Sequence, residues 1–207
     1  MAKFGNSEWD SAAGQGERTL LIRRLGRDEP GEIVRVAARM RATLQEVLGP
    51  EGRDMYAPDW LIDRVRFHVD PARSRGRVWL AVPEGGRSVG HVIARLEPSE
   101  GERALGLIST LYLRPRWRKR GLARRLLNAA EQWLIAEGAG MLAYDTAEDN
   151  VRMIRLLEER GYRITYRSAE KRMVRHSRPA QSPFPPNAGP PRRSVSLASR
   201  PAPDRPR

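Results

Sequence analysis

The spacing of hydrophobic residues between positions 18 and 175 changes repeatedly, and this limits the chain to folds that mix strands with helices. Some segments alternate or are β-rich, as strands are, while others repeat at a period of about 3.6 residues, as helices do. The predicted strands are Thr19–Arg24, Arg77–Val82, Val89–Leu96, Ala104–Leu113, Met141–Asp145 and one or two strands over Tyr162–Val174. The predicted helices run from an N-cap at Asp28 to Leu48, over Pro58–His68, from Gly121 to about Glu137, and over Asp149–Arg160. This order predicts an α/β fold, a mixed sheet flanked by helices.

The two ends of the 207-residue chain differ in composition from this central region. Residues 1–17 are polar and show little periodicity. Residues 176–207 hold nine prolines, five serines and six arginines against one acidic residue. A segment of this kind buries too little apolar surface to offset the entropy lost on ordering. We therefore predict one domain over residues 18–175, with a disordered arm before it and a disordered Pro/Arg/Ser-rich tail after it.

The composition also excludes several kinds of site. The chain has no cysteine, which rules out disulfides, thiolate metal sites and a cysteine nucleophile, and it has only three histidines. We therefore expect no metal. No apolar run approaches the roughly 20 residues that a membrane helix needs, and no secretory signal is recognised. The expectation is a cytoplasmic protein without a membrane partner.

Positive charge is the most pronounced feature of the composition. The chain has 38 lysines and arginines against 25 acidic residues, a formal charge of +13. This balance favours anionic partners, which include nucleic acid, an acidic surface and a phosphate-rich cofactor. The charge alone does not choose between them, and a GC-rich genome produces the same preference for arginine over lysine.

The segment Leu111–Ala123 carries the most chemical information. It predicts a strand, a short basic loop and the start of an amphipathic helix, so unpaired backbone N–H groups meet the positive end of a helix dipole there. Gly121 lacks a Cβ and lets a ligand approach the backbone closely. Arg118, Lys119 and Arg120 add positive charge. These features favour a phosphate site, although a nucleic-acid patch or a solvated basic rim would contain the same residue types.

The pattern Arg118-x-x-Gly121-x-Ala123 resembles the acyl-CoA loop of the GNAT family of N-acetyltransferases. The segment Leu111–Pro115 looks like the fourth strand of that family and its exit. Asn150 stands where the family keeps an asparagine, and Glu158–Tyr162 resembles its Glu-Lys-x-Gly-Phe ending. The order of elements fits as well. The resemblance covers about residues 18–175 and implies the family's mostly antiparallel mixed sheet.

The resemblance implies acetyl-CoA as the cosubstrate. The pyrophosphate would lie on the backbone N–H groups from Arg118 to Ala123, and the pantetheine arm would pair with the strand at Leu111–Leu113. The implied acetyl-CoA-binding residues are Leu111, Tyr112, Leu113, Arg118, Lys119, Arg120, Gly121, Leu122, Ala123 and Asn150. The amine acceptor would approach from the other side, between the first two helices and the end of the third strand. This places the loop Glu51–Tyr56 near the acceptor, although an ordinary helix connection explains that loop equally well.

Two catalytic groups that the family often uses are missing. Leu157 stands in place of the tyrosine that protonates the departing thiolate, and Leu107 appears in place of the glutamate on the fourth strand. A thiol of pKa near 8.5 leaves without a proton at a cost of only about 2 kcal/mol at pH 7, so these losses do not forbid catalysis. The resemblance makes Asp145 the candidate catalytic residue, because some protein N-terminal acetyltransferases of this family hold a catalytic water from that place with a histidine. A cap or loop hydrogen bond ahead of Asp149 is the alternative role.

Four other titratable residues have less positional support. His91 alternates with apolar neighbours and is expected to be a hydrogen-bonded histidine of the sheet rather than a base. Glu97 follows the third strand and could face the acceptor cleft, but it is expected to be a solvated loop carboxylate. Tyr144 and Tyr162 are replacement acids without a positional argument.

The sequence therefore predicts an N-acetyltransferase that moves an acetyl group from acetyl-CoA directly to a primary amine of a small molecule, a peptide or a protein. Two alternatives stay open: a catalytically silent acyl-CoA-binding protein of the same fold, and a basic nucleic-acid-associated protein. No acid-lined acceptor site is evident, which argues against polycationic aminoglycosides. A homodimer also stays open.

Overall fold

The structure, a computed structural model, describes residues 20–98 and 104–165. The predicted N-terminal arm and C-terminal tail lie outside these residues, as does most of the segment Tyr162–Val174. Its described part, residues 162–165, forms no strand. Among the described helices, none is both long and apolar enough to cross a membrane.

The strands form one mixed sheet in the order β1-β2-β3-β4-β5. β1 to β4 pair antiparallel and β5 joins β4 in parallel, so the predicted fold class is confirmed. The strands are β1 (Leu20–Arg24), β2 (Gly76–Pro83), β3 (Gly90–Glu97), β4 (Ala104–Leu113) and β5 (Ala139–Tyr144). The register between β3 and β4 shifts at Ile93/Ala94, which is an irregularity of the β-bulge kind.

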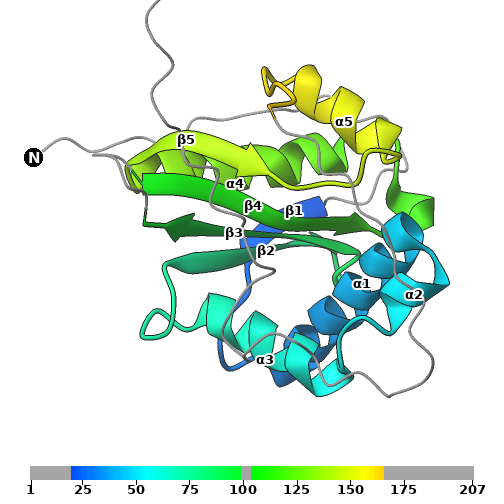
Figure 1. The fold of residues 1–207 in the computed structure, drawn as a ribbon. Coiled ribbons are helices and arrows are strands. Elements are labelled where there is room, and N and C mark those ends of the chain that lie inside the picture. Colours follow the sequence, from blue (N-terminus) through cyan, green and yellow to red (C-terminus); the bar gives the residue numbers. More distant parts are fainter. Residues whose placement is uncertain (1–19, 99–103, 166–207) are drawn as a thin grey trace, which may run out of the picture.

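Helices cover both faces of this sheet (Figure 1). α1 (Pro30–Leu48), the short α2 (Pro50–Arg53) and α3 (Pro58–Val69) lie on one face, and α4 (Leu122–Ala136) and α5 (Val151–Glu158) lie on the other. A 3-10 turn over Pro115–Trp117 leads from β4 towards α4.

Alternating side chains along β3 divide the hydrophobic core into two layers. Val92, Ala94 and Leu96 belong to the layer under α4, and Ile93 to the layer under α1 and α3. The buried residues of α4 are Leu122, Leu126, Leu127, Ala130, Trp133 and Leu134. Burial of each leucine-sized side chain contributes roughly 1.5–3 kcal/mol. This stripe therefore holds α4, and the loop before it, firmly against the sheet.

Several boundaries differ from the sequence prediction by one or two residues, and the following differences matter for the site. The N-cap of α1 is Glu29 rather than Asp28, because Pro30 supplies the first helical residue and the Glu29 carboxylate accepts hydrogen bonds from the Arg23 side chain and the Gly26 N–H. α1 ends before Gly49 as predicted, but α2 follows at once. β5 ends at Tyr144, so Asp145 lies just outside the strand.

Candidate functional site

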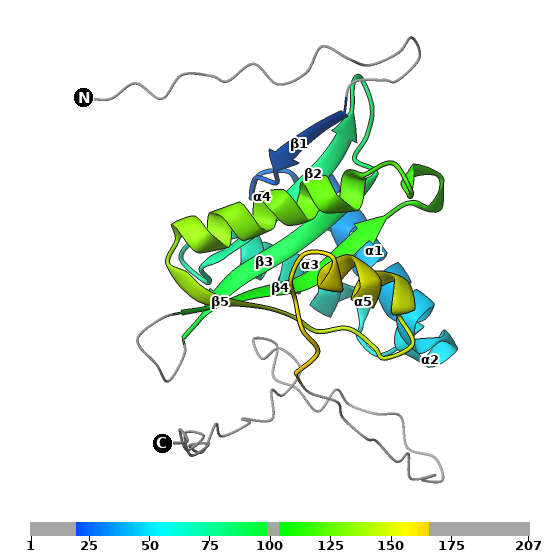
Figure 2. The ribbon, with the colours of Figure 1, turned by 90° about the horizontal axis from the view of Figure 1, so that it is seen from above.

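β4 continues beyond its pairing with β5, which opens a gap along one edge of β4. The parallel pairing ends at Ile108 and Tyr144, whereas β4 extends to Leu113. Figure 2 shows the two strands diverging beyond this point. Within the described residues, the backbone of residues 109–113 therefore has no strand partner on the β5 side.

The direction of the backbone hydrogen bonds identifies which groups face this gap. The Arg114 N–H donates to the Val89 carbonyl at 2.9 Å, towards the start of β3. Because direction alternates along an antiparallel strand, the N–H and C=O groups of Leu111 and Leu113 point towards the gap. The pantetheine arm was predicted to pair with this stretch of backbone.

Two side chains cover these gap-facing groups. Arg118 Nε donates to the Leu113 carbonyl at 2.8 Å, and the Tyr144 hydroxyl lies near the backbone of Leu111. Burial raises the pKa of the Tyr144 hydroxyl above its ordinary value, the Leu111 backbone partly opposes this rise, and the charge of Asp145 adds to it. Tyr144 therefore presents a neutral O–H at neutral pH.

The start of α4 lies beside the end of β4. Gly121 is its N-cap, in the left-handed region at φ 71° and ψ −4°, and Lys119 also has a positive φ of 61°. In the described part of the chain, no group accepts a hydrogen bond from the backbone N–H groups of residues 119–124. Consecutive free donors at the positive end of a helix dipole form an anion site. This is where the pyrophosphate was predicted.

The basic side chains of the loop differ in how they are held. Arg118 is ion-paired with Glu46 of α1 at 2.7 Å, and its guanidinium lies over the Tyr112 ring, 5.6 Å from the centroid. Arg120 lies over the Trp117 ring at 5.3 Å, and Lys119 is exposed. Arg118 thus connects α1, β4 and the loop, while Lys119 extends into solvent.

Asn150 and Asp145 both lie in the segment that connects β5 to α5. Asn150 is the N-cap of α5, and its Nδ2 donates to Thr146 Oγ1 at 2.9 Å, a bond that orders the connection. Asp145 is exposed. Its neighbour Tyr144, which the sequence gave no positional reason to choose, contacts the gap-facing backbone of β4. Tyr144, and not Asp145, is therefore the side chain of this segment that lies near the Leu111 backbone.

The remaining candidates have clear places in the structure. Leu107 and Leu157 are buried, each 3% exposed, so neither position supplies a polar group. His91 is fully buried, and neither ring nitrogen has a partner among the described residues, so the prediction of a hydrogen-bonded histidine is wrong. Burial lowers the pKa of His91 to about 3 and keeps it neutral. Tyr162 donates to Glu131 at 3.1 Å, which engages it away from β4.

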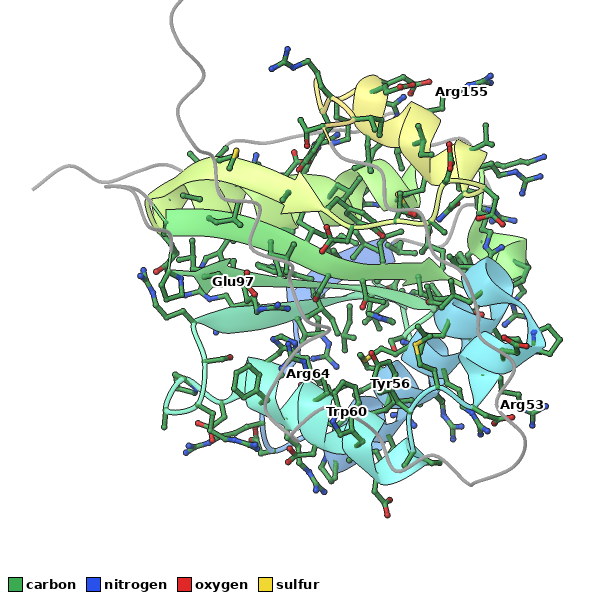
Figure 3. The ribbon with its side chains drawn as sticks, viewed as in Figure 1. Arg53, Tyr56, Trp60, Arg64, Glu97 and Arg155 are labelled. Atoms are coloured by element: carbon green, nitrogen blue, oxygen red, sulfur yellow. The ribbon has the colours of Figure 1, made fainter. Side chains whose placement is uncertain are left out.

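The opposite face of the sheet, towards α3, carries a second group of polar and aromatic side chains (Figure 3). Tyr56 stacks on Trp60, with ring centroids 4.2 Å apart and an interplanar angle of 12°. Glu97 is the last residue of β3, is half-buried and forms an ion pair with Arg95, so the prediction of a solvated loop carboxylate is wrong. The β3–β4 register places Arg95 directly opposite Leu107.

Sequence reasoning missed Arg64 of α3, which is only 5% exposed. Its signal was present in the helical spacing. The buried residues of α3 are Leu61, Arg64, Val65 and His68, and that spacing places all of them on one helix face. An arginine at a core-facing position of an amphipathic helix is an observation that sequence alone can supply.

Comparison with known proteins decides the family. The acetyltransferase (GNAT) family matches residues 42–162, more than half of the chain, and the match includes β4, the basic loop and α4. This chain belongs to the GNAT acetyltransferase family. No curated protein matches it.

Solved structures with the same fold are many, and all those compared here are distant in sequence. An aminoglycoside N-acetyltransferase, AAC(6')-Iy, in complex with CoA has a TM-score of 0.58 at 15% identity, covering 78% of this chain and 99% of that chain. An aminoglycoside acetyltransferase from an uncultured soil metagenomic sample, in complex with sisomicin, has a TM-score of 0.55 at 16% identity, covering 78% and 97%. A Trypanosoma brucei acetyltransferase has a TM-score of 0.54 at 17% identity, covering 75% and 100%. At these identities the likeness establishes the GNAT fold.

Proposed function

We propose that this GNAT protein is an N-acetyltransferase that transfers the acetyl group of acetyl-CoA directly to a primary amine. The observation that carries the proposal is the juxtaposition of the gap along β4 with the free backbone donors of residues 119–124. One is a strand-shaped slot for an amide-bearing arm, and the other is an anion site for a pyrophosphate. CoA contains both groups in that order.

The residues present fit this cosubstrate. The gap-facing N–H and C=O groups of Leu111 and Leu113 match the amides of a pantetheine arm, and Gly121 leaves space above the start of α4, because a Cβ built there meets nothing within 4 Å. Arg118 occupies the Leu113 carbonyl in this structure. A carbonyl has two lone pairs, so the arm can share this oxygen with Arg118 or displace it.

The chemistry then follows from the backbone of β4 and from Tyr144. The Leu111 N–H would donate to the thioester oxygen as the tetrahedral intermediate forms. When the new N–C bond has formed and the C–S bond breaks, Tyr144 would give its hydroxyl proton to the departing sulfur and recover a proton from solvent. The acceptor must lose its own proton to attack, since alkylamines have pKa values near 10.4. Leu107 supplies no base, so water accepts that proton.

An acceptor screen tests the proposal. Purified protein is incubated with acetyl-CoA and representative small amines, peptides, a protein lysine substrate and aminoglycosides, and release of the free CoA thiol is followed. At least one acceptor is expected to raise release far above hydrolysis. Binding is read separately from the melting temperature, because a ligand that binds only the folded state stabilises it by RT ln(1 + [L]/Kd).

The same two measurements separate the alternatives. A catalytically silent acyl-CoA-binding protein, which the buried Leu107 and Leu157 favour, would show the melting shift with acetyl-CoA but no release with any acceptor class. Absence of both the shift and the release would contradict the proposed function altogether.

A further inference from the structure

An open cavity of about 490 Å³ lies between α3 and the end of β3, on the face of the sheet opposite α4. Its charged lining residues are Arg64, Arg73, Arg75, Arg95 and Glu97. A polycationic acceptor requires a site lined by acidic residues, whereas this lining is mostly basic. Figure 3 shows Arg64 of α3 and Glu97 of β3 on this side of the sheet, together with Tyr56 and Trp60.

Carboxylates of the domain already accompany three of the four arginines. Arg73 pairs with Asp63 at 3.1 Å, Arg75 with Glu137 at 3.5 Å, and Arg95 with Glu97. Arg64 is different. Within residues 20–98 and 104–165 it forms no ion pair and no hydrogen bond, and its contact is a cation–π interaction with the Phe67 ring at 4.8 Å. Among the described residues, Arg64 is therefore the one arginine of the cavity lining whose charge no carboxylate contacts directly; Glu97 and Asp63 act on it only at longer range.

This charge is costly to the free protein. Arg64 is 95% removed from solvent, and burying an ionised group without an opposite charge is strongly unfavourable. Burial, together with the charge of Arg95, lowers the pKa of Arg64 to about 10, and the charges of Glu97 and Asp63 only partly oppose this decrease, so the guanidinium stays cationic at pH 7. A cation–π contact compensates for only a small part of that cost. An anionic ligand would remove the imbalance.

The cavity lies at the end of β3 that pairs with the first half of β4, so its distance from the proposed reaction centre can be counted along β4. Arg95 is opposite Leu107 on β4, and Leu111, whose N–H would polarise the thioester, is four residues further along the strand. At about 3.3 Å per residue, this separation is on the order of 13 Å. A ligand that reaches both points is extended and carries its amine and its anion at opposite ends.

We infer that the acceptor of this enzyme is an extended amine with a carboxylate at its far end, of the length of a short peptide, and that Arg64 binds this carboxylate. The inference rests on the proposed function and specifies its substrate class. A monoanion matches the one cavity arginine that no carboxylate contacts, whereas a phosphate dianion would meet about twice the repulsion from Glu97. An extended chain spans about 3.3–3.6 Å per residue, so about four residues cover the distance.

The test uses glycine oligomers of about one to six residues as acceptors, each with a free C-terminal carboxylate or with a C-terminal amide. In the wild-type protein, the carboxylate forms are expected to have a kcat/KM at least 10-fold above the amides, with an optimum near four residues. Arg64→Gln is expected to raise KM for the carboxylate forms about 10-fold or more, with little change in kcat, and to leave the amides unchanged. Arg66→Gln, an exposed arginine on the same helix, is the matched control and is expected to keep the wild-type ratio.

A second measurement needs no variant. N-acetyltriglycine and its amide, which have no free amine, are compared as inhibitors and as thermal stabilisers of the wild-type protein, and the carboxylate is expected to act at 10-fold lower concentration. This readout stays decisive if Arg64→Gln does not fold. Equal activity of carboxylates and amides, a preference for sisomicin, or an unchanged ratio in Arg64→Gln would overturn the inference. A melting shift with N-acetyltriglycine but no CoA release with any amine would instead contradict the proposed function while supporting a carboxylate site.

Discussion

Gly121→Val is the most direct perturbation of the proposed pyrophosphate site. A Cβ at Gly121 meets nothing within 4 Å, so the free protein loses stability only through the backbone conformation, φ 71°. Placing an L-residue in the left-handed region costs roughly 1–2 kcal/mol. For a domain of this size, that corresponds to a decrease in Tm of roughly 2–8 °C. The variant is therefore expected to fold.

The effect on acetyl-CoA binding should be larger. A valine that keeps the positive φ places its side chain where the phosphates approach, and one that turns φ negative reorients the adjacent N–H groups. Loss of two charge-assisted hydrogen bonds, at about 1.5–3 kcal/mol each, weakens binding about 10²- to 10⁴-fold. At a concentration of 100 Kd, acetyl-CoA stabilises the wild-type protein by about 2.7 kcal/mol, roughly 5–11 °C in Tm. The shift in the variant should fall to about 1 °C or less.

The assay is a thermal melt with and without acetyl-CoA, and Gly138→Val is the control. Gly138 follows the same helix at its other end, has a φ of 90°, and a Cβ there also meets nothing within 4 Å. Gly138→Val should lose similar stability yet keep the ligand-induced shift. If Gly121→Val retains the full shift, the phosphates do not lie at the start of α4. If both variants lose it, backbone strain rather than the site is the cause.

Three further predictions concern single residues. Tyr144→Phe is expected to lower kcat about 10- to 100-fold, as loss of a general acid does, with the acetyl-CoA melting shift unchanged; an unchanged kcat would exclude Tyr144 as the proton donor. Glu46→Gln should free Arg118 for the phosphates and tighten acetyl-CoA binding about 2- to 5-fold at low salt, since an exposed ion pair contributes at most about 1 kcal/mol. Calorimetric titration at two salt concentrations measures this effect, and weaker binding, or a gain that does not depend on salt, would contradict the prediction. His91 has a pKa of about 3 in the fold against 6.5 when unfolded, so the unfolded state binds the extra proton and stability falls as pH drops below 6.5. At pH 5 the free energy of unfolding is lower by about 2 kcal/mol for this reason. In urea unfolding, the decrease between pH 7 and pH 5 should therefore be about 2 kcal/mol smaller for His91→Leu than for the wild-type protein.

Sequence reasoning predicted the elements better than it predicted the polar interactions between them. Periodicity is a local property, so the apolar stripe of α4 and the strand β4 could be recognised without tertiary information. The four-residue α2 could not, because it is too short to show a period. The loop motif likewise predicted free N–H groups at the start of α4, since these are also a local feature; that they bind an anion stays a prediction.

The missed features depend on contacts between distant segments. Tyr144 became a candidate only when the β4–β5 register placed its hydroxyl beside Leu111. To find that no carboxylate contacts Arg64 directly, one must know which partners the carboxylates of distant segments have. Glu97 was assigned to a loop because Pro98 follows it directly, and periodicity does not decide on which side of such a boundary residue the strand ends.

The covering of the β4 edge by Arg118 and Tyr144 has a consequence for solubility. A strand with bare N–H and C=O groups on one side is a template for strand addition by another molecule, and arginine or lysine at such an edge is a common protection. In the free protein, Arg118 on the Leu113 carbonyl and Tyr144 on Leu111 leave little of that template exposed. A double variant, Arg118→Ala with Tyr144→Ala, would expose it whenever acetyl-CoA is absent. That protein should self-associate at high concentration and return to the association state of the single variants when the cosubstrate is added, because the bound arm would then complete the sheet.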